Sequence, residues 1–188
     1  MSIRIKLPLD RSKISGLRAG ERVLLSGHLY TARDAAHMKL KEMLDNGHKL
    51  PVDLNNETIY YAGPCPAAPG RVIGSAGPTT SGRMDSYTPA LLEHGLIGMI
   101  GKGDRDDKVV EAIKAKGAVY FGATGGAGAL LSGRIASSEI AAFPELGTEA
   151  IRRIEVVDFP VIVLIDPSGT DIYRTNVIKY RNIREEAD

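Results

Sequence analysis

The stretch "LIGMIGKGDRDDKVVEAIKAKGAVYFG", residues 96–122, decides the fold class of this chain. The apolar runs "LIGMIG" and "AVYFG" at its two ends have the length and composition of buried strands. Between them, Val109, Val110 and Ile113 recur at helical spacing after an N-cap near Asp106. A helix between two apolar strands is the unit of a parallel sheet with right-handed crossovers, so the stretch predicts an α/β fold.

The same pattern extends toward the amino terminus. The apolar run "RVIGS", residues 71–75, is predicted to form the first strand of this region. A short helix is predicted after it, with Thr88 as N-cap, Pro89 at the first helical position and Gly95 as the stop. Together these elements predict a βαβαβ arrangement.

A glycine-rich segment follows each of these three strands. The segments are "AGPTTSGRMD" at 76–85, "GKGDR" at 101–105 and "GATGGAGALL" at 122–131. Because ligands of open α/β sheets bind beyond the carboxyl ends of the strands, we expect the three segments to converge on one site. The third segment matches neither GxGxxG nor a P-loop, so no nucleotide site is predicted, and its glycines indicate tight packing under a ligand or against a partner subunit.

The rest of the chain is interpreted from similar signals. Apolar residues at helical spacing, followed by Gly47, predict a helix from about Asp34 to Asn46. The other predicted elements are strands rather than helices within residues 1–27, a β-like run at "TIYYAG", loops at "GPCPAAPG" and "AFPELGTEAI", a buried strand at "FPVIVLI", a turn at "DPSG" before a last strand, and a frayed tail at about 181–188.

Composition limits the classes of function. A chain of 188 residues fits one or two domains, and with no internal repeat a single domain over residues 1–188 is the simplest expectation. Lys plus Arg, 24, nearly equal Asp plus Glu, 23, which disfavours nucleic acid and anionic membrane as partners.

No apolar run is long enough to span a bilayer and no signal peptide is recognised, so we expect a cytoplasmic protein. The only cysteine, Cys65, excludes an intrachain disulfide and gets no assigned role.

The stretch "SAGPTTSGRMD" concentrates backbone-shaping residues and hydrogen-bond donors. Its glycines and proline are explained by turn geometry alone. Together with Thr79, Thr80, Ser81 and the backbone amides, however, they predict a concave set of donors suited to an anion, to which Gly77 also contributes. Arg83 adds a planar fork that matches a carboxylate or a phosphate.

Three more side chains are candidates, each with a structural alternative. Lys102 lies between two glycines, so it either contacts a ligand or is a solvated lysine in a turn. Arg33 begins the predicted helix, where a cation opposes the helix dipole and calls for a compensating anion; either a ligand or simply the neighbouring Asp34 is that anion. His37 is interpreted as a hydrogen-bonded, surface or half-buried residue rather than as a base.

Several motifs resemble one known family. In order and spacing, "TARDAAH", "YYAGP", "GPTTSGRMD", "GKG", "AFPELGTEAI" and "EVVDFPVIVLID" resemble the β subunit of two-subunit class I fumarate hydratases, equivalent to the carboxyl-terminal domain of the single-chain enzymes. Related L-tartrate dehydratase β subunits share this frame, but "GRMD" is more similar to the fumarase branch. The resemblance implies a swivelling β/β/α three-layer domain, in which the amino-terminal strands add a second β layer.

The resemblance also implies a division of labour. A partner α subunit, in a heterotetramer, would carry a [4Fe–4S] cluster on three cysteines, and its open iron would bind the substrate. In this chain Arg33 and Arg83 would bind the dicarboxylate together with Lys102, and Thr79 would be the catalytic base. Asp85 is the alternative base, or else it orients Arg83. The alternatives to a fumarase subunit are a tartrate dehydratase β subunit and a noncatalytic carboxylate-binding or assembly module.

Overall fold

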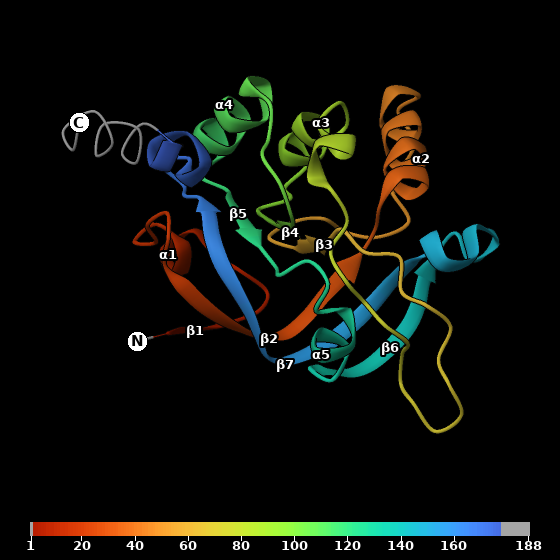
Figure 1. Cartoon of the computed structure of the whole chain (residues 1–188). Helices are drawn as coiled ribbons and strands as arrows, with labels where there is room; N and C mark the ends of the chain where they lie inside the picture. The colour runs from red at the N-terminus through yellow and green to blue at the C-terminus, as the bar shows by residue number, and fades with distance from the viewer. Residues whose placement is uncertain (1, 178–188) are drawn as a thin grey trace.

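In the computed structural model, which describes residues 2–177, the strands form one sheet in the order β1-β2-β3-β4-β5-β7-β6 (Figure 1). The strands are β1 (Ile3–Lys6), β2 (Arg22–Thr31), β3 (Thr58–Tyr60), β4 (Gly98–Gly101), β5 (Val119–Gly122), β6 (Ile135–Ala142) and β7 (Ile151–Ile165). Strands β1 to β5 pair in parallel, each with the next, and β7 is antiparallel to β2, β5 and β6.

The sheet closes on itself because β2 and β7 pair along most of their length. Their register runs from Arg22 opposite Ile162 to Thr31 opposite Arg152. Since β7 also pairs with β5, strands β2, β3, β4, β5 and β7 form a closed five-strand barrel, with β1 and β6 attached outside the ring. The predicted α/β class is confirmed, whereas the three-layer β/β/α arrangement is not.

The predicted βαβαβ region holds in its second half and is wrong in its first. The strands at 98–101 and 119–122 are parallel, as predicted, but "RVIGS" is not a strand. It folds back on the preceding loop, where the amide of Cys65 donates to the carbonyl of Ser75 and the amide of Gly74 donates to that of Cys65. The strand that precedes this region in the barrel is β3, the "TIYYAG" run.

Short helices lie around the barrel, on more than one side (Figure 1). They are α1 (Arg11–Ile14), α2 (Asp34–Asp45), α3 (Thr88–Glu93), α4 (Asp107–Lys116) and α5 (Gly128–Ser132), with 3-10 turns η1 (Ser81–Met84) and η2 (Pro144–Glu149). Figure 1 shows α2, α3 and α4 side by side above the strands. Each buries an apolar stripe, such as Leu40 of α2 and Ile113 of α4, against the barrel, as amphipathic helices do.

The predicted boundaries hold for α2 and α4, one predicted cap is wrong, and two helices, α1 and α5, are absent from the sequence prediction. The helix predicted at 34–46 is confirmed, and Asp106 caps α4 by accepting the amide of Val109. Thr88, however, is the first helical residue and not the N-cap; its hydroxyl donates to the carbonyl of Met84 at 2.9 Å. The α1 helix was not predicted; its signal is Asp10, whose carboxylate accepts the amide of Lys13.

The last predicted strand is also wrong. Residues 172–177, after the "DPSG" turn, are helical. The side chain of Asp171 accepts the amide of Tyr173 at 2.8 Å, which satisfies an amide at the helix start. The tail predicted at about 181–188 lies outside the described residues.

Aromatic residues fill much of the core and tie loops to the strands. Tyr60 and Phe159 are fully buried, with ring centroids 5.3 Å apart in an edge-to-face arrangement. The Tyr60 hydroxyl donates to the carbonyl of Ala76 at 2.7 Å, and burial raises its pKa. This bond fixes the chain just before the predicted ligand segment at 77–85.

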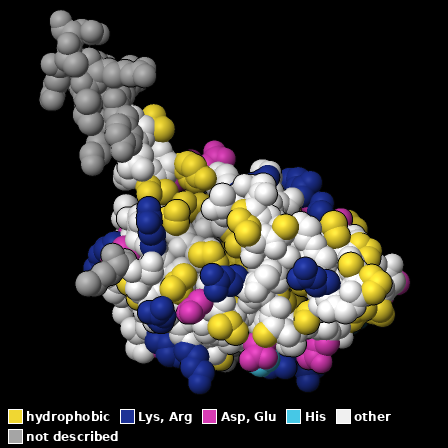
Figure 2. Space-filling view, turned by 60° about the horizontal axis from the view of Figure 1, so that its bottom comes forward, with side chains coloured by type: hydrophobic (Ala, Val, Ile, Leu, Met, Phe, Trp, Pro, Cys, Tyr) yellow, Lys and Arg dark blue, Asp and Glu magenta, His cyan; other side chains and the backbone are white. Residues whose placement is uncertain are grey.

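The surface carries mixed charges. Figure 2 shows basic, acidic and hydrophobic side chains interspersed on one face of the molecule, with no continuous basic area there. Within residues 2–177, no helix has the length and apolar character needed to cross a membrane.

Candidate active site

The three glycine-rich segments come together, as predicted, although the first of them does not follow a strand. Thr80 pairs with Lys102 in an isolated parallel bridge. The amide of Ser81 donates to the carbonyl of Lys102 at 2.9 Å, and the amide of Lys102 donates to the Ser81 hydroxyl at 3.1 Å. The third segment joins through Gly128, whose carbonyl accepts the amide of Ala76 at 3.1 Å.

Two glycines make this convergence possible. A Cβ added to Gly101, at the end of β4, would lie 1.9 Å from the Ser81 hydroxyl oxygen. A Cβ on Gly128 would lie 2.9 Å from the backbone nitrogen of Gly77. Contacts this short do not occur for real side chains, so glycine is required at both positions. The third segment therefore packs tightly against another segment of the same chain.

The two predicted arginines meet at one carboxylate. Asp34, the first residue of α2, places Oδ2 3.0 Å from Nε of Arg33 and Oδ1 3.2 Å from Nε of Arg83. Partial burial raises the pKa of the Asp34 carboxyl, but the hydrogen bond from Arg33 and the charge of Arg83 outweigh burial and leave the pKa lowered. The compensating anion expected for Arg33 is thus Asp34, with Glu149 Oε1 at 3.5 Å from the same Nε.

Thr79 is in contact with this cluster. The half-buried Thr79 hydroxyl accepts a hydrogen bond from Nη2 of Arg83, and its amide donates to the carbonyl of Tyr61 at 2.7 Å. A guanidinium that donates to a hydroxyl oxygen favours the deprotonated form of that hydroxyl. Arg33, Asp34, Arg83 and Thr79 therefore form a continuous series of contacts.

The predicted set of anion donors is only partly present. Ser81 is fully buried, its hydroxyl hydrogen-bonds to Tyr120 at 2.8 Å, and its amide is used by Lys102, so Ser81 does not face a ligand. Thr80 is exposed beside Lys102, and Gly77 is half-buried. Among the described residues, no carboxylate pairs with the exposed ammonium of Lys102.

Comparison with known proteins identifies the family. The model of the family described as "Fumarase C-terminus" matches residues 1–176. The chain belongs to the fumarase C-terminus family.

Similar proteins carry related names. "Fumarate hydratase 2" of Leishmania major is 44% identical over 177 residues, which cover 92% of this chain and 31% of that protein. "Fumarate hydratase class I, aerobic" of Escherichia coli strain K12 is 44% identical over 87% of this chain and 30% of its own length. The chain thus spans about a third of these relatives. "Putative L(+)-tartrate dehydratase subunit beta" of Methanocaldococcus jannaschii is 37% identical over 94% of both chains.

In this fumarase C-terminus chain, Asp85 does not orient Arg83. Its Oδ1 lies 2.6 Å from Nε of Arg105, and its Oδ2 accepts the amide of Asp106 at 2.8 Å. The alternative role that we predicted for Asp85, as an orienting partner of Arg83, is therefore wrong, and Asp34 occupies that place.

Arg105 is the residue that sequence reasoning missed. It is 3% exposed, and its guanidinium lies over the rings of Tyr61 and Tyr120, at 5.4 and 4.9 Å from their centroids. It also donates to the Thr88 hydroxyl at 2.8 Å. Arg105 belongs to the "GKGDR" segment, but nothing in that polar run indicates burial. Through Asp85 and Thr88 it fixes η1 and α3 to the loop that carries Lys102.

In this family member, His37 contacts the backbone of Arg33 from the protein interior. It is fully buried, so the surface or half-buried position that we predicted is wrong, although it is hydrogen-bonded: its Nδ1 donates to the carbonyl of Arg33 at 3.1 Å. Burial lowers its pKa to about 4, so the imidazole is neutral at pH 7. His37 supports the backbone at Arg33 and does not add charge to the site.

The chain's own residues do not fit a [4Fe–4S] cluster. Such clusters are held by several cysteine thiolates, whereas the chain has one cysteine, Cys65, which is exposed in a loop. In residues 2–177, no group of three or more His, Cys, Asp or Glu side chains is placed to hold a metal ion.

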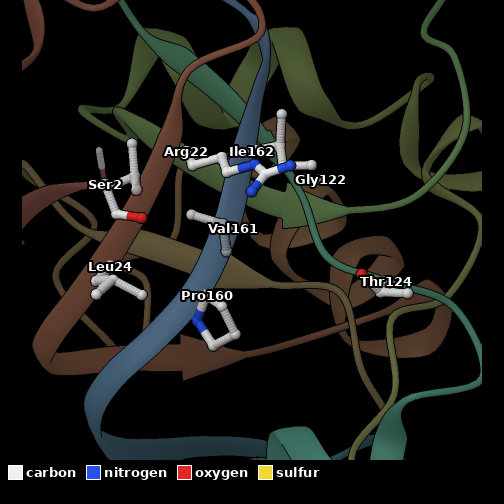
Figure 3. Close-up of a pocket in the computed structure, with 9 residues that line it drawn as sticks. Ser2, Arg22, Leu24, Gly122, Thr124, Pro160, Val161 and Ile162 are labelled. Carbon is white, nitrogen blue, oxygen red and sulfur yellow. The ribbon is translucent and has the colours of Figure 1, made fainter.

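A separate pocket lies on the barrel wall of this fumarase C-terminus chain. It has a volume of about 230 Å³, and Figure 3 shows Arg22 of β2 directed toward Gly122, with Thr124 at the other side. None of the candidate site residues lines it, so changes to its side chains leave the contacts of the candidate site intact.

Proposed function

We propose that this chain is the β subunit of a class I hydro-lyase that interconverts fumarate and (S)-malate. The observation that carries the proposal is the contact series of Arg33, Asp34, Arg83 and Thr79, with Lys102 bonded to the same turn. The names of its relatives support the reaction. The rest of the active site, including the [4Fe–4S] cluster, would be supplied by an α subunit.

The charge of the substrate explains the choice of residues. Fumarate is a small dianion, so two guanidinium forks and an ammonium offset its charge and fix its orientation. Arg33 and Arg83 would each bind a carboxylate, and Lys102 would approach from the next strand end. Orientation matters because a substrate held in reactive geometry needs less loss of freedom on the way to the transition state.

The proton transfer in the dehydration of malate explains the role proposed for Thr79. Dehydration of malate removes a weakly acidic proton from the carbon next to a carboxylate, and negative charge develops on that carboxylate. Cations held around it would stabilise this charge. Thr79 would accept the proton, and because a threonine hydroxyl is a poor base at its ordinary pKa, it needs Arg83 to stabilise its alkoxide.

L-tartrate is the second candidate substrate. The observation that favours it is the Methanocaldococcus jannaschii relative, which matches this chain over nearly its full length. Tartrate is also a four-carbon dianion, so the same cations suit it. Assays of the assembled enzyme with fumarate, malate and L-tartrate at matched concentrations distinguish the two substrates.

The chain alone is expected to fold but not to catalyse hydration. Its residues do not fit a cluster, and activity should appear only when it is mixed anaerobically with a cluster-bearing α subunit. Circular dichroism reports folding of the isolated chain, and loss of fumarate absorbance reports hydration. Fumarate hydration by the purified, iron-free chain would refute the subunit role, and full activity of the α subunit alone would leave this chain an assembly module.

Replacing Arg33, Arg83 or Lys102 with alanine is expected to lower kcat/KM of the assembled enzyme for fumarate. Each variant loses a charge-assisted contact to the dianion, and we expect a cost of about 2–4 kcal/mol, roughly 30- to 900-fold. Arg22→Ala, which removes an arginine from the pocket in Figure 3, is the matched control and should stay near wild type. Wild-type kinetics in any of the three variants would remove that residue from the site.

A further inference from the structure

Asp34 differs from the other acidic residues near the site because one carboxylate serves two arginines. Arg33 precedes it in the chain, whereas Arg83 comes from η1 on the other side of the site. The Asp34 oxygens are divided between them, with Oδ2 3.0 Å from Nε of Arg33 and Oδ1 3.2 Å from Nε of Arg83. A single short side chain therefore links the two cations that would bind the dicarboxylate.

The nitrogen atoms used in these contacts are informative. Arg33 donates a hydrogen bond from Nε to Asp34, whereas Arg83 makes an ion pair with Asp34 through Nε and donates from Nη2 to Thr79. Within residues 2–177, Nη1 and Nη2 of Arg33 and Nη1 of Arg83 have no protein partner at hydrogen-bonding distance. Since a guanidinium is planar, fixing Nε also fixes the direction of the remaining N–H groups.

Capping of helix α2 does not explain the contacts of Asp34. The amide of Ala35, in the first turn of α2, donates to Oε2 of Glu149 at 2.8 Å, so a side chain from η2 already serves this helix start. Glu149 lies farther from Arg33, at 3.5 Å. The shorter contacts of Asp34 are directed to the guanidinium groups, which would otherwise repel each other.

We propose that Asp34 is a positioning residue of the dicarboxylate site, holding Arg33 by a hydrogen bond from its Nε–H group and Arg83 by an ion pair at its Nε, so that their free Nη groups bind the substrate. This inference rests on the proposed function, because the substrate is taken to be a dicarboxylate. The inference identifies Asp34 as the residue that sets the spacing and direction of the two guanidinium groups. Asp34 itself does not contact the substrate.

The kinetic test compares Asp34→Asn with Asp45→Asn in the assembled enzyme. Asp45 is at the other end of α2 and pairs with Lys41 at the surface, so its variant loses the same charge from the same helix. We expect Asp34→Asn to lower kcat/KM for fumarate by at least about tenfold and Asp45→Asn to change it by less than about twofold. Equal, small effects of both variants would overturn the proposal.

A mutant cycle separates positioning from a structural role. If Asp34 acts through the arginines, Asp34→Asn should lower kcat/KM by less than about threefold in an enzyme that already carries both Arg33→Ala and Arg83→Ala. A full additional loss in that background would overturn the proposal, because Asp34 would then act independently of both arginines. Melting temperatures of the isolated chains show whether any variant is partly unfolded.

A readout on the full chain without substrate tests the contacts directly. In nitrogen-15 NMR spectra, the Nε–H signal of Arg33 should be protected from exchange with water, and it should lose protection in Asp34→Asn but not in Asp45→Asn. Protection that survives in Asp34→Asn would overturn the proposal. If the wild-type assembly does not hydrate fumarate, the proposed function fails, while this signal still decides whether Asp34 holds Arg33.

Discussion

Replacing Arg105 with alanine is expected to destabilise the folded chain by about 3–5 kcal/mol. The Arg105 side chain is fully buried against an Asp85 side chain that is 11% exposed, with 2.6 Å between Nε and Oδ1. Removing the guanidinium leaves a carboxylate whose remaining partner is the amide of Asp106, and it also removes the contacts to the rings of Tyr61 and Tyr120. Urea unfolding followed by circular dichroism measures the change in the free energy of unfolding.

Two further variants make this test specific. Arg153→Ala removes an arginine that is 43% exposed and lies 3.6 Å from Glu139, and exposed pairs of this kind contribute about 0–1 kcal/mol. The double variant Arg105→Met with Asp85→Asn should be less destabilised than Arg105→Ala, because no charge is then left buried without a partner. A loss below about 1 kcal/mol for Arg105→Ala would show that the buried pair does not hold η1 to the loop of Lys102.

Sequence reasoning predicted those parts of the fold that depend on local signals. Helix α4 combines an apolar stripe at Val109 and Ile113 with the Asp106 cap and a glycine stop, and these signals agree with one another. The loops after β4 and β5 were placed at one end of the sheet because parallel strands end at the same edge. This reasoning places Lys102 correctly, whereas it places Thr79 only through the run "RVIGS", which is not a strand.

The closure of the barrel could not be predicted in the same way. It depends on β2 pairing with β7, whose residues are more than a hundred positions away, and no local pattern encodes this partner. The run "RVIGS" was misread because a short apolar segment has the same composition in a strand and in a loop that folds back on itself. Likewise, the helix at 172–177 depends on one side-chain contact of Asp171.

The same limit applies to the site. Local patterns indicate Arg33, Arg83 and Lys102 as candidates and the family resemblance implies their roles and that of Thr79, but the contacts of these residues are not accessible from the sequence. Asp85 was assigned to Arg83 because the two are neighbours in the chain, whereas in space its partner is Arg105. Side chains two residues apart on a short turn need not face each other, so proximity along the chain was a poor guide to pairing.

The roles of Thr79 and Arg83 are tested most directly by Thr79→Val, which keeps the shape of the side chain and removes its oxygen. We expect the assembled variant to bind a dicarboxylate inhibitor such as succinate within a few-fold of wild type, since the cations remain. Exchange of the carbon-bound proton of malate with deuterated solvent, followed by NMR, should fall by about 10²–10⁴-fold, the range for loss of a general base.

Two controls accompany this variant. Thr124→Val removes a hydroxyl from the pocket in Figure 3 and should leave proton exchange unchanged. Thr79→Ser retains the oxygen beside Arg83 and should keep most of the exchange. If Thr79→Val exchanges the proton at a rate near wild type, the base lies elsewhere, and Asp85→Asn is the next variant to measure. Because Asp85 pairs with Arg105, Asp85→Asn is also expected to lower the free energy of unfolding, as Arg105→Ala does.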